Sequence, residues 1–185
     1  MKKIFFAICM MASSSVFAAS ATLVLQDADG IKGSSDQRSI GIVIRESINN
    51  NFSVDGLLSN TWNESNGGVA SFRIETGLTS SAKIIGPIGV YNRIAVGQKF
   101  ISTGNFSYYS VEPGITAPIY NDLSLRIGYR FRNAFDDEKY TDETRTARYG
   151  LNYKIDKSNS LGVRYDVMRG DVNRNIIAVS YTRNF

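Results

Sequence analysis

The chain has 185 residues, a formal net charge of +4 and one cysteine. This charge balance is too weak for a nucleic-acid-binding protein, and a lone cysteine excludes an internal disulfide. Nothing after the first 18 residues approaches the ~18 to 20 continuous apolar residues of a transmembrane helix.

Residues 1–18 have the three-part pattern of a secretory signal peptide. Met1-Lys2-Lys3 is the charged start, an apolar run follows from Ile4 to Met11, and small residues lead up to Ala18. We expect cleavage after Ala18, or one residue later. Cys9 and both lysines leave with this segment, so the charge of the remaining chain falls to about +2.

Period-two alternation of apolar and polar residues dominates the rest of the chain, and no helical period of useful length is present. Membrane-spanning strands need ~9–11 residues, which most of these runs provide. In chain order, the expected strands are 21–27, 39–49, 52–63, 69–80, 88–100, 106–118, 123–133, 144–155, 159–169 and 174–185.

The connections between these runs alternate in kind, as in bacterial barrels with short periplasmic turns and longer extracellular loops. Expected turns are 50–51, 120–122, 156–158 and a longer segment, 81–87; expected outer loops are 29–38, 64–68, 101–105, 134–143 and 170–173. The pattern predicts an all-β, transmembrane, antiparallel up-and-down barrel over residues 19–185, of about ten strands, with twelve or eight as alternatives.

A soluble β-sandwich or lipocalin-like barrel would show the same alternation. Aromatic placement favours the membrane barrel, because Tyr129, Tyr149 and Tyr165 share the apolar face of their strands near strand ends, as in an interfacial girdle. The opposite face is rich in Arg, Glu, Gly, Ser and Asn, which would be a poor soluble core. The final strand ends on Phe185, with Tyr181 four residues before it. It resembles the signal read by the barrel-assembly machinery.

If the apolar face meets lipid, the charged residues point into the lumen. A one-residue slip would expose them to lipid at about 2–4 kcal/mol for an arginine near midplane, so they support the register. Centring each turn predicts a connected band in the order Arg45, Asp55, Glu75, Arg93, Glu112, Arg130, Arg148, Asp166. Further inward basic residues are Arg73, Lys99, Arg126, Arg132, Lys154 and Arg164.

This band has two interpretations. Cross-linked arginines and acids can fill and close a small barrel. Alternatively, adjacent unpaired Arg130 and Arg148 and the basic surplus can form an anion-selecting eyelet, since rings of Arg select anions and a guanidinium fork matches carboxylates.

The segment from Tyr108 to Asp136 resembles a known family. Glu112-Pro113-Gly114-Ile115, and Gly128 to Asp136 in the run Gly-Tyr-Arg-Phe-Arg-Asn-Ala-Phe-Asp, are similar to the oligogalacturonate-specific, KdgM-type monomeric porins. The resemblance implies passage of acidic oligosaccharides along a basic lumenal track. By matching positions, that track comprises Arg126, Arg130, Arg132, Arg148 and Arg164.

An enzyme is not expected, because the chain has no histidine and the barrel enzymes of this membrane resemble one another in using one. The acids Asp136, Asp137, Glu138, Asp142 and Glu143 are interpreted as a solvated outer loop, with no metal or cofactor. We therefore expect a monomeric outer-membrane channel for small anionic solutes, in contact with membrane lipid and lipopolysaccharide. The alternative is a closed structural or adhesion barrel of the OmpX or OmpA type.

Overall fold

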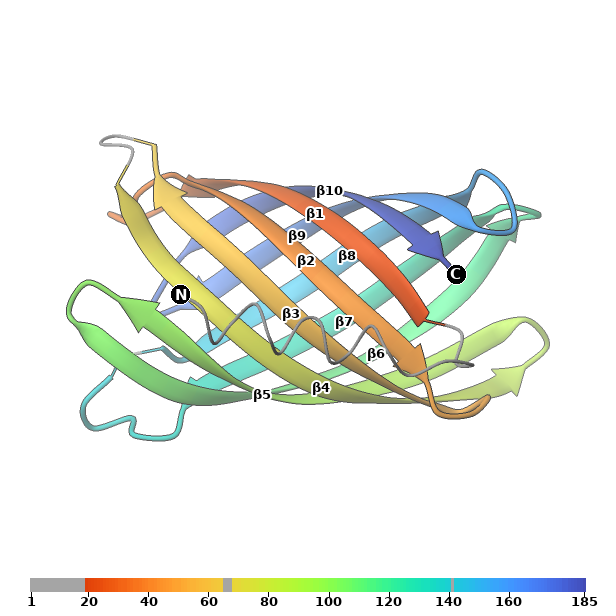
Figure 1. Cartoon of the computed structure of the whole chain (residues 1–185), viewed down its shortest axis with the longest axis horizontal. Coiled ribbons are helices and arrows are strands. Elements are labelled where there is room, and N and C mark those ends of the chain that lie inside the picture. The colour runs from red at the N-terminus through yellow and green to blue at the C-terminus, as the bar shows by residue number, and fades with distance from the viewer. Residues whose placement is uncertain (1–18, 65–67, 141) are drawn as a thin grey trace.

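The computed structural model describes residues 19–64, 68–140 and 142–185, and the expected signal peptide lies outside these residues. Ten antiparallel strands follow one another around a closed barrel, and β1 pairs with β10 to complete it (Figure 1). The strands are β1 (Ala19–Gly30), β2 (Gln37–Ser47), β3 (Phe52–Asn63), β4 (Val69–Ile85), β5 (Ile88–Ile101), β6 (Gly104–Tyr120), β7 (Leu123–Ala134), β8 (Thr144–Lys154), β9 (Asn159–Gly170) and β10 (Arg174–Asn184). The predicted ten-stranded up-and-down barrel is confirmed.

Alternation along each strand separates a lipid-type outer face from the interior. On β10, Ile177 and Val179 are 55% and 49% exposed, whereas Ala178 between them is 3% exposed. The closing ladder sets Leu25 of β1 opposite Val179. Two large apolar side chains therefore lie side by side on the outer face, as a surface in contact with hydrocarbon requires. Within the described residues, no helix is long and apolar enough to cross a membrane.

The fourth strand is longer than expected. Residues 81–85, expected to belong to a turn, continue β4 and pair with β5, so only Gly86-Pro87 connects the two strands. A bulge between Lys83 and Ile85 absorbs the irregular end of this ladder. The β4–β5 hairpin extends past the β2–β3 turn at the end of the barrel where the C-terminus lies (Figure 1).

The other turns at this end are tight. In the β8–β9 turn, the Asp156 carboxylate accepts hydrogen bonds from the backbone N–H groups of Ser158 and Asn159 and from the Asn159 side chain. These donors favour the charged form, and the Asn159 side chain contributes most to lowering the pKa of Asp156. This Asx-type turn fixes the start of β9.

Inward glycines make room for two large lumenal tyrosines. Tyr91 of β5 lies opposite Gly114 of β6 and reaches as far as Gly128 of β7. A Cβ atom on Gly114 would lie 2.3 Å from the Tyr91 ring. Gly97 makes the corresponding space for Tyr108, which packs with Phe106 and Ala134 in a small core near the start of β6 and the end of β7.

We predict that Gly114→Ala destabilises the barrel, whereas Gly56→Ala does not. The added methyl group at Gly114 forces Tyr91 to move, and overpacking of this kind costs about 1–3 kcal/mol. A Cβ on Gly56 meets nothing within 4 Å. Urea unfolding of the refolded variants measures both effects, and equal midpoints for the two variants would contradict this packing.

Candidate ion pathway inside the barrel

Arg93 of β5 joins two buried carboxylates on neighbouring strands. Its Nε and Nη2 donate to Asp55 at 3.0 and 2.5 Å, and its Nη1 donates to Glu75 at 2.7 Å. Both acid side chains are 1% exposed. A fork of this kind supplies the hydrogen bonds that a buried carboxylate needs. Arg45 adds a longer ion pair to Asp55, at 3.8 Å.

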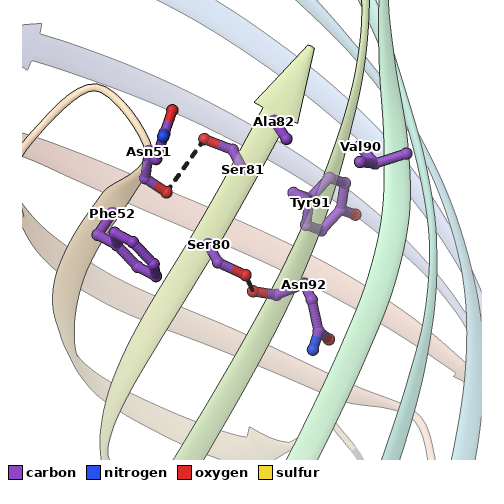
Figure 2. Close-up of a pocket in the computed structure, with 8 residues that line it drawn as sticks. All are labelled: Asn51, Phe52, Ser80, Ser81, Ala82, Val90, Tyr91 and Asn92. Atoms are coloured by element: carbon purple, nitrogen blue, oxygen red, sulfur yellow. Dashed lines mark hydrogen bonds between the residues drawn. The ribbon is translucent and has the colours of Figure 1, made fainter. Parts of the chain in front are cut away.

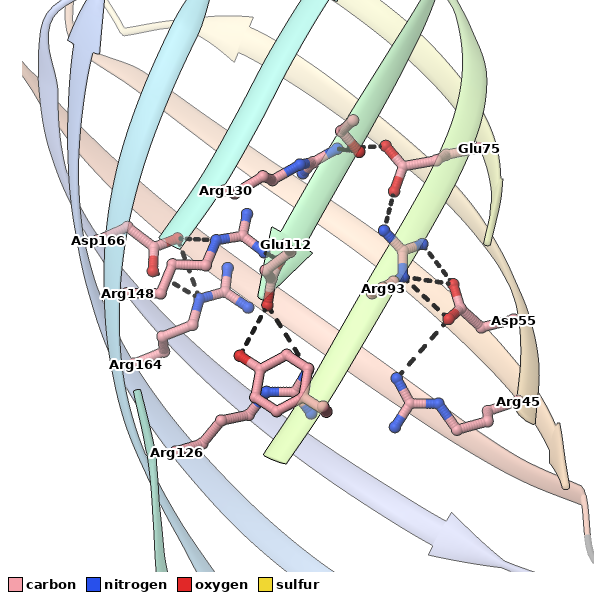
Figure 3. A network of polar contacts seen from close by, with 12 residues as sticks. Arg45, Asp55, Glu75, Arg93, Glu112, Arg126, Arg130, Arg148, Arg164 and Asp166 are labelled. Atoms are coloured by element: carbon pink, nitrogen blue, oxygen red, sulfur yellow. Dashed lines mark hydrogen bonds and ion pairs between the residues drawn. The ribbon is translucent and has the colours of Figure 1, made fainter. Parts of the chain in front are cut away.

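Glu75 also extends the network across the lumen. Its second oxygen accepts from Arg130 Nη2 at 2.6 Å and from the Tyr108 hydroxyl at 2.7 Å. Arg130 Nη2 further donates to Ser110 at 3.1 Å. Because Glu75 lies on β4 and Arg130 on β7, this contact joins strands that are not neighbours in the sheet (Figure 3).

A second group of charges lies on β6 to β9. Arg148 donates to Glu112 at 2.5 Å, and Arg126 lies 3.5 Å from the same carboxylate. Arg164 Nε contacts both oxygens of Asp166, at 2.9 and 3.0 Å. Arg148 lies 3.7 Å from Asp166 and so links the two acids (Figure 3).

Tyr91 of β5 adds an aromatic ring to this second group. Its hydroxyl donates to Glu112 at 3.1 Å, and the Arg126 guanidinium lies 3.6 Å from the centre of its ring. This distance is well within the range of a cation–π contact. Arg126 is thus positioned by a ring and a carboxylate, yet its side chain stays 38% exposed.

A cavity of about 670 Å³ lies beside these charges. The wall formed by β1 and β10 carries only uncharged side chains among the residues that line the cavity. Two hydrogen bonds order that wall, between the Thr22 and Thr182 hydroxyls at 2.8 Å and from Ser39 to Gln26 at 3.0 Å. The lumen is therefore two-sided, with guanidinium groups facing hydroxyl and amide groups.

A second hollow, of about 440 Å³, lies against β3, β4 and β5 (Figure 2). Its lining consists of Asn51, Phe52, Ser80, Ser81, Ala82, Val90, Tyr91 and Asn92. It contains no charged side chain, so we do not assign it to an ion pathway. Among the described residues, no group of three or more His, Cys, Asp or Glu side chains is arranged to hold a metal ion.

Part of the expected charge register is confirmed. Arg45 lies opposite Asp55, Arg93 opposite Glu112 and Arg148 opposite Asp166. The β6–β7 ladder, which pairs Val111 with Phe131 and Gly114 with Gly128, also keeps Glu112 opposite Arg130. The three remaining expected pairings are displaced along the strands. Asp55 and Glu75 instead face Gly77 and Gly97, Arg130 faces Thr146, and Arg148 faces Gly128.

The largest displacement follows from the longer β4, because continuation of the strand to Ile85 moves the centre of the β4–β5 hairpin. The expectation that Arg130 and Arg148 are adjacent and unpaired was wrong. Each donates to a carboxylate, Arg130 to Glu75 and Arg148 to Glu112.

The remaining predicted residues lie in three places. Arg73 lines the cavity and donates to Ser59 at 3.2 Å, and no acid lies within ion-pair distance of it among the described residues. Arg132 lies farther out and contacts Asp142. Tyr181 and the exposed Phe185 lie at the end of the barrel where the C-terminus is, and the Tyr181 hydroxyl donates to Asn159 there (Figure 1).

Sequence reasoning missed Tyr91, Tyr108 and Asp142 as partners of the charges. Both tyrosines have the inward parity of their strands, so alternation could have identified them. Asp142 was interpreted as part of a solvated loop, but its side chain is 1% exposed. A loop has no fixed period, so no pattern in the sequence signals this burial.

Comparison with known proteins supports the fold through structure alone. No protein-family model matches the chain, and no curated protein matches it. An outer membrane channel from Pseudomonas putida F1 aligns with a TM-score of 0.60 and 11% identity, over 94% of this chain and 97% of that one. The KdgM porin in complex with disordered oligogalacturonate aligns with a TM-score of 0.54 and 14% identity, over 90% and 99%.

The beta domain of the Bordetella autotransporter Brka is also similar, with a TM-score of 0.53 and 9% identity, over 91% and 99% of the two chains. At these identities the comparisons show the fold, which is that of outer-membrane β-barrels. The resemblance to KdgM porin is confirmed at this level. The porins and channel among the matches agree with the expectation that the chain is not an enzyme.

We predict that Glu75→Gln destabilises the barrel far more than Glu143→Gln. Loss of the Glu75 charge leaves Arg130 buried without an anionic partner, and breaking a buried pair costs about 3–5 kcal/mol. Glu143 pairs with Arg145 at an exposed site, where such a pair contributes about 0–1 kcal/mol. Denaturant unfolding in lipid vesicles, followed by Trp62 fluorescence, compares the two; similar losses would show that the Glu75 network does not stabilise the fold.

Proposed function

We propose that this chain is an outer-membrane channel that passes small anionic solutes, with acidic oligosaccharides as one class. The observation that carries the proposal is the charge of the cavity lining. It contains seven arginines and three carboxylates: Arg45, Arg73, Arg93, Arg126, Arg130, Arg148 and Arg164 against Asp55, Glu75 and Glu112. A lumen with a surplus of fixed guanidinium groups attracts anions and repels cations.

The arginines of the lining have two different roles in this proposal. Arg93, Arg130 and Arg148 are at most 17% exposed in their side chains and hold the acids. Arg45 and Arg126 remain 40% and 38% exposed, so they can meet a solute. Arg73, without an acidic partner among the described residues, belongs with the second group.

The KdgM porin with which the chain shares its fold was solved with oligogalacturonate, an acidic oligosaccharide. The hydroxyl-rich wall opposite the arginines is chemically suited to such a solute. Sugar hydroxyls can exchange hydrogen bonds with Ser and Thr side chains while carboxylates face the guanidinium forks.

A closed structural or surface-interaction barrel is the second candidate. Its support is the cross-linking of the interior, since Asp55, Glu75, Glu112 and Asp166 are all nearly buried and each contacts at least one arginine. A barrel of this kind would function through its outer loops rather than its lumen.

The proposal places the mature chain, residues 19–185, in the bacterial outer membrane as a monomer after removal of residues 1–18. The charged and apolar start of the sequence supports export. The apolar outer face supports contact with lipid and lipopolysaccharide. Insertion by the barrel-assembly machinery is supported by the last strand, in which Tyr181 and Phe185 are exposed aromatic residues.

We predict that the refolded protein gives stable conductance steps in a planar bilayer and that a salt gradient yields an anion-directed reversal potential. The guanidinium surplus of the cavity is the physical reason. A folded barrel that stays silent would instead support the closed structure, and cation preference would contradict the proposed selectivity.

We predict that Arg73→Gln combined with Arg126→Gln weakens this anion preference. One charge changes the energy of an ion ~4 Å away in water by about 1 kcal/mol, so the chloride-to-potassium permeability ratio should fall by at least roughly threefold. The matched control is Arg38→Gln with Arg169→Gln, which removes two exposed positive charges from the outer face. Equal ratios in both double variants would show that these lumenal arginines do not set selectivity.

A further inference from the structure

A further charged site lies apart from the two groups of charges described above, towards the end of the barrel that the proposed function places outside the cell. Lys99 of β5 and Arg132 of β7 converge there on Asp142, which precedes β8. The Asp142 side chain is 1% exposed, although Asp136, Asp137 and Glu138 in the same connection are exposed. A single acid of this loop is therefore drawn into the barrel.

The two cations hold Asp142 as they would hold any carboxylate. Its Oδ1 accepts from Lys99 Nζ at 3.0 Å and from Arg132 Nη2 at 2.8 Å. Arg132 Nε lies 2.7 Å from Oδ2, so the guanidinium faces both oxygens. Nε and Oδ2 form no hydrogen bond with each other, so one hydrogen bond from Nη2 and one close ion-pair contact from Nε hold the carboxylate.

Strand β6, which lies between the two cation-bearing strands, supplies an aromatic floor. The Lys99 ammonium is 5.5 Å from the centre of the Phe106 ring, and the Arg132 guanidinium is 5.4 Å from that of Tyr108. Tyr140 stacks on Phe106 with ring centres 4.9 Å apart. The cations are thus positioned by rings that belong to the barrel wall, and not only by Asp142.

This outer pair also connects to the cavity below. Arg73, which lines the cavity, lies directly opposite Lys99 in the β4–β5 ladder. Arg132, Lys99 and Arg73 therefore form a row of basic side chains that leads from this site to the cavity.

We propose that Lys99 and Arg132 form an outer subsite for a solute carboxylate, and that Asp142 occupies it as a tethered competitor. This inference rests on the proposed anion pathway and deepens it. An incoming carboxylate replaces Asp142 on the same donors, so the two cations are never left without an anion. The protein avoids a buried unpaired charge and still keeps a carboxylate site.

Isothermal titration of the folded protein in detergent with glutarate, a small dicarboxylate, tests the subsite. When a competitor occupies a site more than nine-tenths of the time, its removal raises the apparent affinity about tenfold. We expect this gain in Asp142→Asn but not in Asp137→Asn, which removes an equal charge from an exposed position of the same loop. The gain should disappear when Lys99→Met is added to Asp142→Asn.

Equal glutarate affinity in the wild type and Asp142→Asn overturns the inference, as does a gain that survives the loss of Lys99. This readout needs no conductance. If the barrel does not conduct but shows the affinity gain, the subsite stands and the proposed channel function fails. If the barrel conducts anions but shows no gain, the channel function stands and the subsite fails.

A measurement on the wild type covers the case in which Asp142→Asn fails to fold. Displacement of Asp142 frees the loop, so glutarate should accelerate tryptic cleavage after the exposed Lys139, followed by mass spectrometry. Glutaramide, which has the same shape without charge, should not accelerate it. Identical cleavage rates with the two compounds contradict competition at Lys99 and Arg132.

Discussion

Closure of the backbone hydrogen-bond ladder is the constraint on which the rest of this structure depends. Hydrocarbon offers no partner for a free N–H or C=O group, so a sheet can cross a membrane only when its first and last strands pair. Here β1 and β10 pair over eleven residues, from Ser20 with Asn184 to Gly30 with Arg174. Once the sheet is closed, every second side chain must point into a narrow interior.

That interior explains why charges in this barrel occur in groups. Guanidinium and carboxylate groups cannot remain unpaired in a confined space without a large cost in solvation free energy. Glu75 therefore receives Arg93, Arg130 and Tyr108 at once, and Glu112 receives Arg148, Arg126 and Tyr91. Arginines outnumber acids in the cavity lining, so some arginines neutralise the acids and others remain exposed at the edge of the cavity. The stability of the barrel and its proposed selectivity therefore depend on one set of residues.

The sequence predicted the strands well because alternation is imposed locally by burial on one face. The strands β3, β7 and β9 begin and end within one residue of the expected positions. The end of β4 was missed because Ser81, Ala82 and Lys83 lack an apolar alternation. Backbone pairing of these residues with β5 needs no apolar side chain, so the ladder continues where the pattern stops.

The contacts of the candidate site were less predictable than the strands. Inward parity correctly placed Arg130 and Glu75 on the lumenal face, but their bond spans from β7 to β4 and depends on side-chain length and rotamer. Register errors of one or two pleats also changed the expected neighbours. The burial of Asp142 depends on the conformation of a loop, for which hydrophobic periodicity carries no information.

The placement of the central ion pairs has a consequence for the order of assembly. The charged residues of these ion pairs run from Arg45 on β2 to Arg164 and Asp166 on β9, and none of them comes from β1 or β10. Across the seam between the terminal strands, the inward contact is a neutral one, between Thr22 and Thr182. The electrostatic interior can therefore form completely within a curved, open sheet. Joining the two ends is left to backbone pairing and uncharged side chains, and no buried charge has to be desolvated at that last step.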